Sequence, residues 1–372
     1  MKKIIAFVLV AVLLCGCSAA ESAETAETET AAATAAPTTE PAAAPTEAPT
    51  TAPATEPAPV FRNPLNGEVI EEPFTDRVFA VVISNIPSAL PHVGVTKADI
   101  LMEMYVNATI VRCLALYTDI ESAEAIGSTR STRLMFNDIC QHYDLILAHA
   151  GGSGLCLSDA ERKNLDHYNV DSLMRYDDPL RRGTAYRDKE YKYGEHNLFT
   201  IGTGFKAFVE SRDVNMTLEK DYGLNFTEEA TPVSGEAADE ISILFIYGEA
   251  VKETKMIYDT ALGQYVYNQY GKEMADQITG ELEGFENVIV MHVPMTVVAA
   301  SGTVYHQADF LAGGTGYFAN GGKLIPIVWT CDGDSEPFRF FTEDGEPLNL
   351  GVGKTYIAVT STQSAVEYTG AE

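Results

Sequence analysis

Apolar residues recur with the spacings of strands and helices from about residue 60 onward. Strand-like runs lie at 78–84, 99–106, 110–117 and 145–149. Apolar residues at 136, 139, 140 and 143 form one face of a helix, and a second helix is expected near 157–168. This succession of strand, helix, strand, glycine-rich loop and helix predicts an α/β N-terminal domain over 61–225. Its sheet is expected to be mixed and partly parallel.

The pattern changes after about residue 225, where strand-like runs follow one another with few helical segments. They lie at 241–248, 255–260, 264–270, 287–293, 303–310, 316–319, 323–330, 338–341 and 355–360. Asn320-Gly321-Gly322 and Asp344-Gly345 have the composition of hairpin turns. Residues 226–362 are therefore predicted to form a β-rich (α+β) C-terminal domain, followed by a C-terminal tail over 363–372.

Residues 1–17 have the pattern of a lipoprotein signal peptide. Two lysines precede an apolar run from Ile4 to Leu14, which is too short to span a bilayer stably. Leu14-Cys15-Gly16-Cys17 then matches a lipobox, in which the small Gly16 precedes the cut and Cys17 receives the lipid. An ordinary secretory signal with two incidental cysteines is the alternative. We expect a lipid anchor on the outer face of a bacterial cytoplasmic membrane, in a Gram-positive envelope.

Residues 18–60 consist mainly of Ala, Thr, Glu and Pro. Prolines recur every four residues from Pro37 to Pro57, which excludes a continuous helix because each proline removes a backbone donor and clashes with the preceding turn. Since the segment has little apolar surface to bury, it is predicted to be a disordered tether. At about 3.1 Å per residue, an extended tether would reach on the order of 100 Å.

Charge and cysteine content narrow the function further. The formal net charge of −28 argues against nucleic acid as a partner and against a basic face that binds anionic lipid. Beyond the signal, cysteines occur at 113, 140, 156 and 331, mostly within apolar segments where a free thiol is typical. Their disulfide status stays open at this point, a Cys140–Cys156 bridge included. There is no CxxC and no histidine-rich metal spacing, so no cofactor is expected.

Two arginines carry the main indication of a binding site. Arg130 and Arg133 follow Gly127 at the predicted start of a helix, with Ser128 or Thr129 as the candidate cap. Cations oppose the helix dipole there, but a helix N-terminus with two arginines is suited to binding an anion. The alternative is that the arginines pair with carboxylates such as those of Asp138 or Glu124.

Further candidate residues join these arginines if strands 110–117 and 145–149 are parallel. All would then lie at the carboxyl edge of one sheet, where open α/β sheets bind ligands. The candidates are Arg112, His149, Gly151, Gly152, Ser153, His196 and Asn197, with Asp99 and Glu103 as acidic partners. Simpler interpretations stay open: the glycines form a tight turn, His149 is a core histidine, and Asp99 is a cap, a partner of Arg112 or a cation ligand. The segment lacks the GxGxxG, phosphate-loop and GxSxG patterns.

At these residues the chain resembles the YerB-like lipoproteins, a family of unknown function with N- and C-terminal domains. Similar segments are Ala80–Asn85, Ala98–Ile100 with Glu103, Arg112–Leu116, Ile126–Arg133, His149–Ser153, His196–Phe199, Ile257–Asp259, Asn287–Val290 and Gly351–Thr355. The resemblance implies two domains in an envelope lipoprotein and brings no established reaction. Glu195 departs from an expected proline. Tyr267-Asn268-Gln269 stands where the family tends to carry an arginine.

Two function hypotheses follow. The favoured one is a binding or scaffolding lipoprotein that holds an anionic ligand, or a cell-wall or envelope protein partner. The alternative is an enzyme that acts on a phosphorylated or pyrophosphorylated envelope substrate through an arginine-lined cleft. In that case Asp99 or Glu103 would place a divalent cation, since arginines and a cation are what phosphoryl transfer requires. No catalytic residue is assigned.

Overall fold

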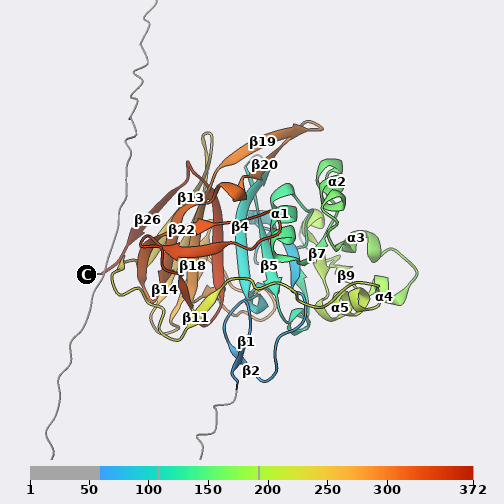
Figure 1. Cartoon of the computed structure of the whole chain (residues 1–372). Helices are drawn as coiled ribbons and strands as arrows, with labels where there is room; N and C mark the ends of the chain where they lie inside the picture. The colour runs from blue at the N-terminus through green and yellow to red at the C-terminus, as the bar shows by residue number, and fades with distance from the viewer. Residues whose placement is uncertain (1–58, 108, 192, 372) are drawn as a thin grey trace, which may run out of the picture. The chain divides into compact units, whose positions relative to one another are not determined.

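The computed structural model describes residues 59–107, 109–191 and 193–371 (Figure 1). These residues belong to one unit, which extends from Ala58 to Glu372. The predicted signal peptide over 1–17, its lipid acceptor Cys17 and nearly all of the predicted tether lie outside the described residues. Within the described ranges, no helix is both long and apolar enough to cross a membrane.

A large mixed sheet, here called the central sheet, takes strands from both halves of the chain (Figure 1). Along its main path lie β12 (Glu236–Ala237), β22 (Lys323–Thr330), β21 (Gly314–Asn320), β18 (Asn287–Val293), β25 (Thr355–Ser361), β4 (Ile100–Asn107), β5 (Ile110–Tyr117), β3 (Phe79–Ser84), β7 (Ile146–His149) and β8 (His167–Asn169). Strands β19 (Met295–Ala300), β20 (Thr303–Ala308) and β23 (Arg339–Thr342) join beside this path. The pairs β18–β25, β25–β4, β3–β7 and β7–β8 are parallel, which confirms the predicted mixed, partly parallel sheet.

A second, six-stranded sheet comes from the C-terminal half, which is strand-rich as predicted. It contains β16 (Lys272–Glu273), β15 (Gln264–Gln269), β14 (Ala250–Asp259), β13 (Glu240–Tyr247), β26 (Ala365–Thr369) and β17 (Gly284–Phe285). Strand β26 lies within residues 363–372, the predicted C-terminal tail, and is not among the predicted strands. Val366 and Tyr368 pack against the core opposite Ile243 and Ile241 of β13, and this long-range pairing orders a segment with a weak local signal.

Helices and short strands complete the described structure. The helices are α1 (Leu134–Tyr143), α2 (Gly154–Arg162), α3 (Val170–Leu173), α4 (Pro179–Arg182) and α5 (Gly202–Glu210). Short 3-10 helices occupy Pro87–Ala89, Val95–Lys97, Ile120–Ser122, Gly194–His196 and Phe310–Ala312. Small sheets pair β1 (Phe61–Arg62) with β2 (Val69–Ile70), β10 (Leu198–Thr200) with β6 (Ile126–Gly127) and β9 (Ala185–Arg187), and β11 (Asn225–Thr227) with β24 (Asn349–Gly351).

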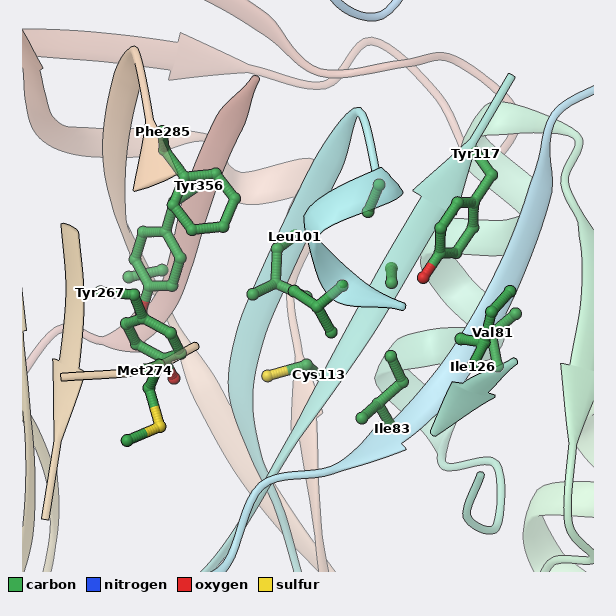
Figure 2. Close-up of a cluster of buried hydrophobic side chains, with 14 of the residues drawn as sticks. Val81, Ile83, Leu101, Cys113, Tyr117, Ile126, Tyr267, Met274, Phe285 and Tyr356 are labelled. Carbon is green, nitrogen blue, oxygen red and sulfur yellow. The ribbon is translucent and has the colours of Figure 1, made fainter. Parts of the chain in front are cut away.

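The core lies on both faces of the central sheet, because successive side chains of a strand point to opposite faces. One face packs against the six-stranded sheet: Leu101 and Cys113 belong to the same cluster as Tyr267 and Tyr356 (Figure 2). The other face packs against α1, where Leu114 shares a cluster with several helix residues. All eight residues of β4 are buried. The cysteines at 113, 140, 156 and 331 are buried and free, so they form no Cys140–Cys156 bridge.

Candidate functional site

The segment that carries the arginines is extended, contrary to the predicted helical start. Helix α1 begins at Leu134, with Arg133 as its N-cap residue and no side-chain cap. Ahead of it, Arg130 N donates to Val82 O of β3 at 2.8 Å. Thr129 is not a cap, since its hydroxyl contacts Ile126 O and the Thr200 hydroxyl. The sheet therefore satisfies this segment's backbone, and this long-range pairing outweighs the local capping signal.

The strands that bring the candidates together also differ from the prediction. Strand β3 lies between β5 and β7, antiparallel to the first and parallel to the second, so β5 and β7 are neither adjacent nor parallel. Arg112 nevertheless reaches the predicted edge. It lies near the start of β5 and is paired with Ser84 at the carboxyl end of β3. Because β5 runs antiparallel to β3 and β7, the start of β5 lies at the same edge of the sheet as the carboxyl ends of β3 and β7.

Three arginines converge around one short stretch of backbone; we call Arg112, Arg130 and Arg133 the arginine edge. The carbonyl oxygen of Ser131 accepts from an Nη of Arg112 at 2.5 Å and from an Nη of Arg133 at 3.4 Å. Arg130 donates to the backbone oxygen of Glu195 at 2.5 Å. The hydrogen bonds that hold these guanidinium groups therefore go largely to neutral backbone oxygens, which leave the positive charges in place.

Arg133 is also held by two residues that the sequence reasoning missed. Its Nε donates to Asn107 Oδ1 at 3.2 Å, and its guanidinium lies 5.7 Å from the ring centroid of Tyr305. Tyr305 comes from β20 and pairs with Asn107 at the end of β4. No local signal could have identified Tyr305, because more than 170 positions of chain separate it from Arg133.

No carboxylate of the described residues lies within 4 Å of the arginine edge. The proposed partner Asp138 instead pairs with Lys163 at 2.5 Å, which excludes the ion-pair alternative for that residue. Burial lowers the pKa of Arg112 well below its usual value, and the charges of Arg133 and Arg130 lower it further. A bound anion would relieve this repulsion, so the arrangement favours anionic ligands.

His196 reaches the arginine edge from the loop before β10. It is 1% exposed, and its Nε2 lies 3.1 Å from the hydroxyl of Ser88, another residue that the sequence reasoning missed. Burial lowers the pKa of His196, and the charges of Arg130 and Arg112 also lower it, so the neutral ring is favoured. The buried Nδ1 of His196 and Nε atoms of Arg112 and Arg130 have no hydrogen-bond partner among the described residues.

The other candidates at this edge have structural roles. His149 is fully buried; its Nδ1 lies 2.8 Å from Gly151 O and its Nε2 lies 3.0 Å from His167 Nδ1. Burial lowers the pKa of His149 to about 4, so at neutral pH it adds no positive charge. Asn197 accepts from Arg187 at 2.7 Å and donates to Asp188 O, which ties β9 to the chain after it.

The glycine segment forms the turn from β7 into α2. Gly151 has a φ of 73°, a left-handed conformation that favours glycine, and its oxygen accepts from Thr132 N at 3.0 Å. A Cβ on Gly152 would approach Leu157 to 3.0 Å. The Ser153 hydroxyl caps α2 by accepting from Cys156 N at 3.3 Å. This turn therefore positions the backbone beside the arginine edge.

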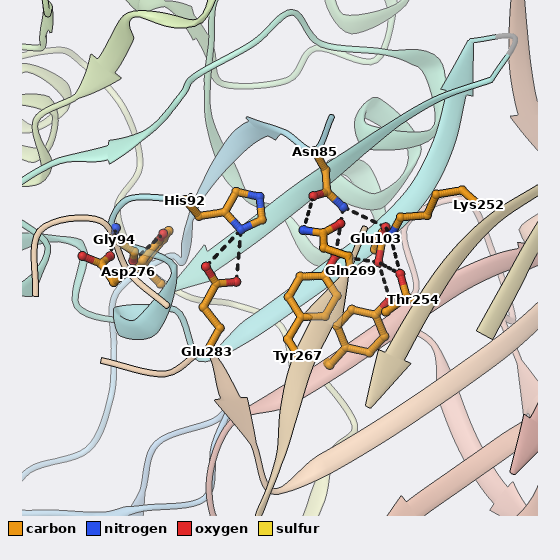
Figure 3. A network of polar contacts seen from close by, with 12 residues as sticks. Asn85, His92, Gly94, Glu103, Lys252, Thr254, Tyr267, Gln269, Asp276 and Glu283 are labelled. Atoms are coloured by element: carbon orange, nitrogen blue, oxygen red, sulfur yellow. Dashed lines mark hydrogen bonds and ion pairs between the residues drawn. The ribbon is translucent and has the colours of Figure 1, made fainter. Parts of the chain in front are cut away.

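The structure does not bring the two acidic candidates to the arginine edge. Glu103 lies on β4 beside the residue that pairs with Arg112, but it points to the opposite face of the central sheet. Its carboxylate accepts from Tyr356 at 2.5 Å and from Tyr267 at 2.8 Å, and it pairs with Lys252 (Figure 3). Burial alone would raise the pKa of Glu103, but Lys252 and the hydroxyl donors lower it overall. Asp99 directly precedes β4, at the other end of the strand.

Neither acid is therefore available to place a cation beside the arginines. No group of three or more His, Cys, Asp or Glu side chains in the described ranges is arranged to hold a metal ion. The resemblance leads one to expect an arginine within Tyr267-Asn268-Gln269. Tyr267 instead donates to the buried carboxylate of Glu103. Glu195 accepts from Arg130 through its backbone oxygen, and the charge of its carboxylate partly offsets the lowering of the Arg130 pKa by burial.

Comparison with known proteins places this fold in a family. Residues 65–215 match the N-terminal domain and residues 244–357 the C-terminal domain of a protein family of unknown function, DUF3048. The chain belongs to this family. The two matches fall within the predicted domains 61–225 and 226–362, whose boundary stays a prediction.

The chain is similar to a Bacillus subtilis protein in both sequence and structure. The chain is 26% identical over 306 residues to a Bacillus subtilis (strain 168) protein named "Putative lipoprotein YerB", covering 81% of this chain and 87% of that protein. The crystal structure of the YerB protein from Bacillus subtilis matches with a TM-score of 0.70 at 22% identity, covering 82% of this chain and 99% of the other. The structural match establishes the shared fold, and the resemblance to the YerB-like family is confirmed.

Proposed function

We propose that this protein is a lipid-anchored envelope protein whose arginine edge binds an anionic ligand, or an anionic group on a wall or protein partner. The observation that carries the proposal is the convergence of Arg112, Arg130 and Arg133 without a carboxylate of the described residues within 4 Å. In a chain with a net charge of −28, three clustered arginines with no ion pair among the described residues are unusual and suited to binding an anion.

The anchoring part of the proposal rests on the lipobox that ends at Cys17 and on the name of the Bacillus subtilis relative. The tether over 18–60 would hold the folded unit away from the outer face of the cytoplasmic membrane of a Gram-positive cell. Detergent phase partition tests this arrangement: the wild-type protein should enter the detergent phase, and the Cys17→Ala protein should stay in the aqueous phase. Equal partition of both would contradict lipidation at Cys17.

Titration calorimetry of the full chain with inorganic phosphate and pyrophosphate tests the binding site. Arg130→Gln and Arg133→Gln should each weaken binding at least about tenfold, which corresponds to about 1.4 kcal/mol. Binding should also weaken as salt is added, because ions screen partly exposed charges.

Arg162→Gln is the matched control, since Arg162 lies on α2 with a side chain that is 70% exposed and is already paired with Asp159. It should bind the anions as the wild-type protein does. If neither anion produces heat, or if the two edge variants bind as tightly as Arg162→Gln, the proposed site is wrong.

The enzymatic alternative has weaker support. Phosphoryl transfer would require a cation beside the arginines, yet Glu103 is buried on the opposite face of the central sheet and Asp99 lies at the other end of β4. We therefore propose binding rather than catalysis as the role of the arginine edge.

A further inference from the structure

The hairpin of β19 and β20 leaves one edge of the central sheet without a neighbouring strand. It extends outward from the sheet at the top of Figure 1. Strand β20 pairs with β19 on one side and with the end of β4 on the other, whereas β19 pairs with β20 alone among the described strands. Backbone N–H and C=O groups along the outer side of β19 are therefore available to another β-strand.

Strand β19 lacks the features that keep the edges of natural sheets from pairing. Such edges are short, or carry charged side chains, prolines or bulges. Among the other described edges of the two large sheets, β8, β12, β16 and β17 have two or three residues, β23 contains Arg339 and β26 contains Glu367. Strand β19 has six residues, none of them charged or a proline, and its register against β20 has no shift.

The whole hairpin is uncharged, although the chain is strongly acidic. No Asp, Glu, Lys or Arg occurs from Met295 to Ala308, whereas charged residues make up 21% of the chain and its net charge is −28. Val297 in the edge strand is 52% exposed. A large net charge keeps copies of a protein apart. At this hairpin, two copies can meet without bringing like charges into contact.

The turn of the hairpin determines which backbone groups point outward. Ser301 and Gly302 have φ values of 51° and 76°, as in a two-residue turn of type I′, and Ala300 pairs with Thr303 across it. Residues that flank such a turn exchange hydrogen bonds, and bonded and non-bonded pairs alternate along the strands from there. Alternate residues of β19, from Ala300 back to Thr296, therefore bond to β20.

The remaining residues of β19 match a second copy of the same strand. Met295, Val297 and Ala299 direct their N–H and C=O groups away from β20. If two β19 strands lie antiparallel about a two-fold axis at Val297, this residue pairs with its own counterpart, and Met295 pairs with Ala299 of the partner subunit. All three outward residues are then paired, a large side chain lies beside a small one, and two β-branched side chains lie side by side. The edge is therefore self-complementary.

We propose that β19 is a dimerisation edge, at which two copies of this chain join their central sheets by antiparallel pairing of β19 with β19. Six residues on each side make a small contact compared with permanent interfaces. The dimer should therefore be reversible, with a dissociation constant between about 1 μM and 1 mM. The proposal does not rest on anion binding at the arginine edge.

Sedimentation equilibrium over a series of concentrations tests the dimer. The full chain carries Cys15→Ala/Cys17→Ala, so that no lipid brings two copies together, and its average mass should rise from one chain toward two. Adding Val297→Lys places two like charges opposite each other at the edge and should raise the dissociation constant at least about tenfold, or about 1.4 kcal/mol.

Gln307→Lys is the matched control for this variant. It adds the same charge at an exposed position of the same hairpin, but on β20, which is not the edge strand. It should dimerise as the parent chain does. A parent chain that stays monomeric up to about 1 mM, or equal dissociation constants for the two lysine variants, would overturn the proposal.

Cysteine cross-linking tests the register of the pair. The Cα atoms of a hydrogen-bonded antiparallel pair lie about 5.5 Å apart, which a disulfide can bridge. In the same parent chain, whose remaining four cysteines are buried, Val297→Cys should give a covalent dimer on a non-reducing gel after mild oxidation. Gln307→Cys should not, because β19 of both copies lies between its two thiols. Equal yields of covalent dimer from these two variants would overturn the proposed pairing.

Discussion

Arg112 shows how burial and like charge act on one side chain. It is 4% exposed, its guanidinium donates to the Ser131 backbone at 2.5 Å, and the positive charges nearby are those of Arg130 and Arg133. Removing one partner from a buried charge is costly because the remaining charge is uncompensated. Burial and the neighbouring positive charges both disfavour the charged form of Arg112, and an anion bound there, as proposed, would offset both effects.

His149 gives a pH dependence that can be measured. Burial lowers its pKa from 6.5 to about 4 in the folded state, so between these values the unfolded chain binds a proton that the folded protein does not. Stability should therefore fall as the pH decreases through this window, by on the order of 3 kcal/mol. Urea unfolding across the window should show the loss.

The His149→Asn variant is the comparison for this prediction. Its amide can still donate to Gly151 O, but it does not titrate, so its stability should fall less over the same pH range. If both proteins lose equal stability, His149 does not carry the effect.

Among the elements, the turn from β7 into α2 shows how a short motif supports the site. Gly151 adopts the left-handed conformation, Ser153 caps α2, and Thr132 N bonds back to Gly151 O at 3.0 Å. The local sequence accounts for the turn and the cap. Its contact with the segment that carries Arg130 and Arg133 depends on the pairing of β3 with β7.

Ser153→Ala should destabilise the protein by about 1 kcal/mol, because the first turn of α2 loses its side-chain acceptor. Chemical denaturation measures the free energy of unfolding. Ser158→Ala in the exposed middle of the same helix is the control and should have no cost, since alanine favours helices. A cost of Ser153→Ala no greater than that of Ser158→Ala would show that the cap is energetically unimportant.

At the scale of the whole molecule, the two halves of the chain share one sheet. Strand β4 pairs with β5 of its own half and in parallel with β25 of the other half. All eight residues of β4 are buried, and the buried ion pair between Glu103 and Lys252 also joins the halves (Figure 3). Each family domain therefore completes the core of the other.

A fragment of residues 59–225 should not fold alone, because it would expose both the apolar face and the hydrogen-bonding edge of β4. We expect it to aggregate or to melt without cooperativity, as followed by size-exclusion chromatography and near-UV circular dichroism. Co-expression with residues 226–371 should restore a folded complex. A monodisperse, cooperatively melting fragment would instead show that the N-terminal half is an independent domain.

The strands were predictable where local patterns are strong. The runs at 110–117, 287–293 and 323–330 coincide with β5, β18 and β22, since β-branched and aromatic residues bounded by turn residues carry their own signal. The glycines at 321 and 322 have φ values of 61° and 77°, as a hairpin turn requires. Strand β26 was missed because its order comes from pairing with β13, more than a hundred residues earlier.

The candidate site was predicted only in part. Arg112, Arg130, Arg133 and His196 do meet at one sheet edge, although the predicted helix start and the predicted parallel strands were both wrong. His149, Ser153 and Asn197 hold structure, and Asp99 and Glu103 lie elsewhere. Residue types and spacing indicate which side chains are able to bind an anion, but not which of them face the same side of a sheet.

The sequence by itself determined the class of fold, the order of the strands along the chain and the lipobox pattern at Cys17, because each of these depends on residues close in sequence. Only the tertiary structure decided that Arg112 and Glu103 face opposite sides of one sheet, that Tyr305 contacts Arg133, and that strands from both halves pair in one sheet. These features depend on strand order and register, which arise from contacts between distant segments and leave no local signature.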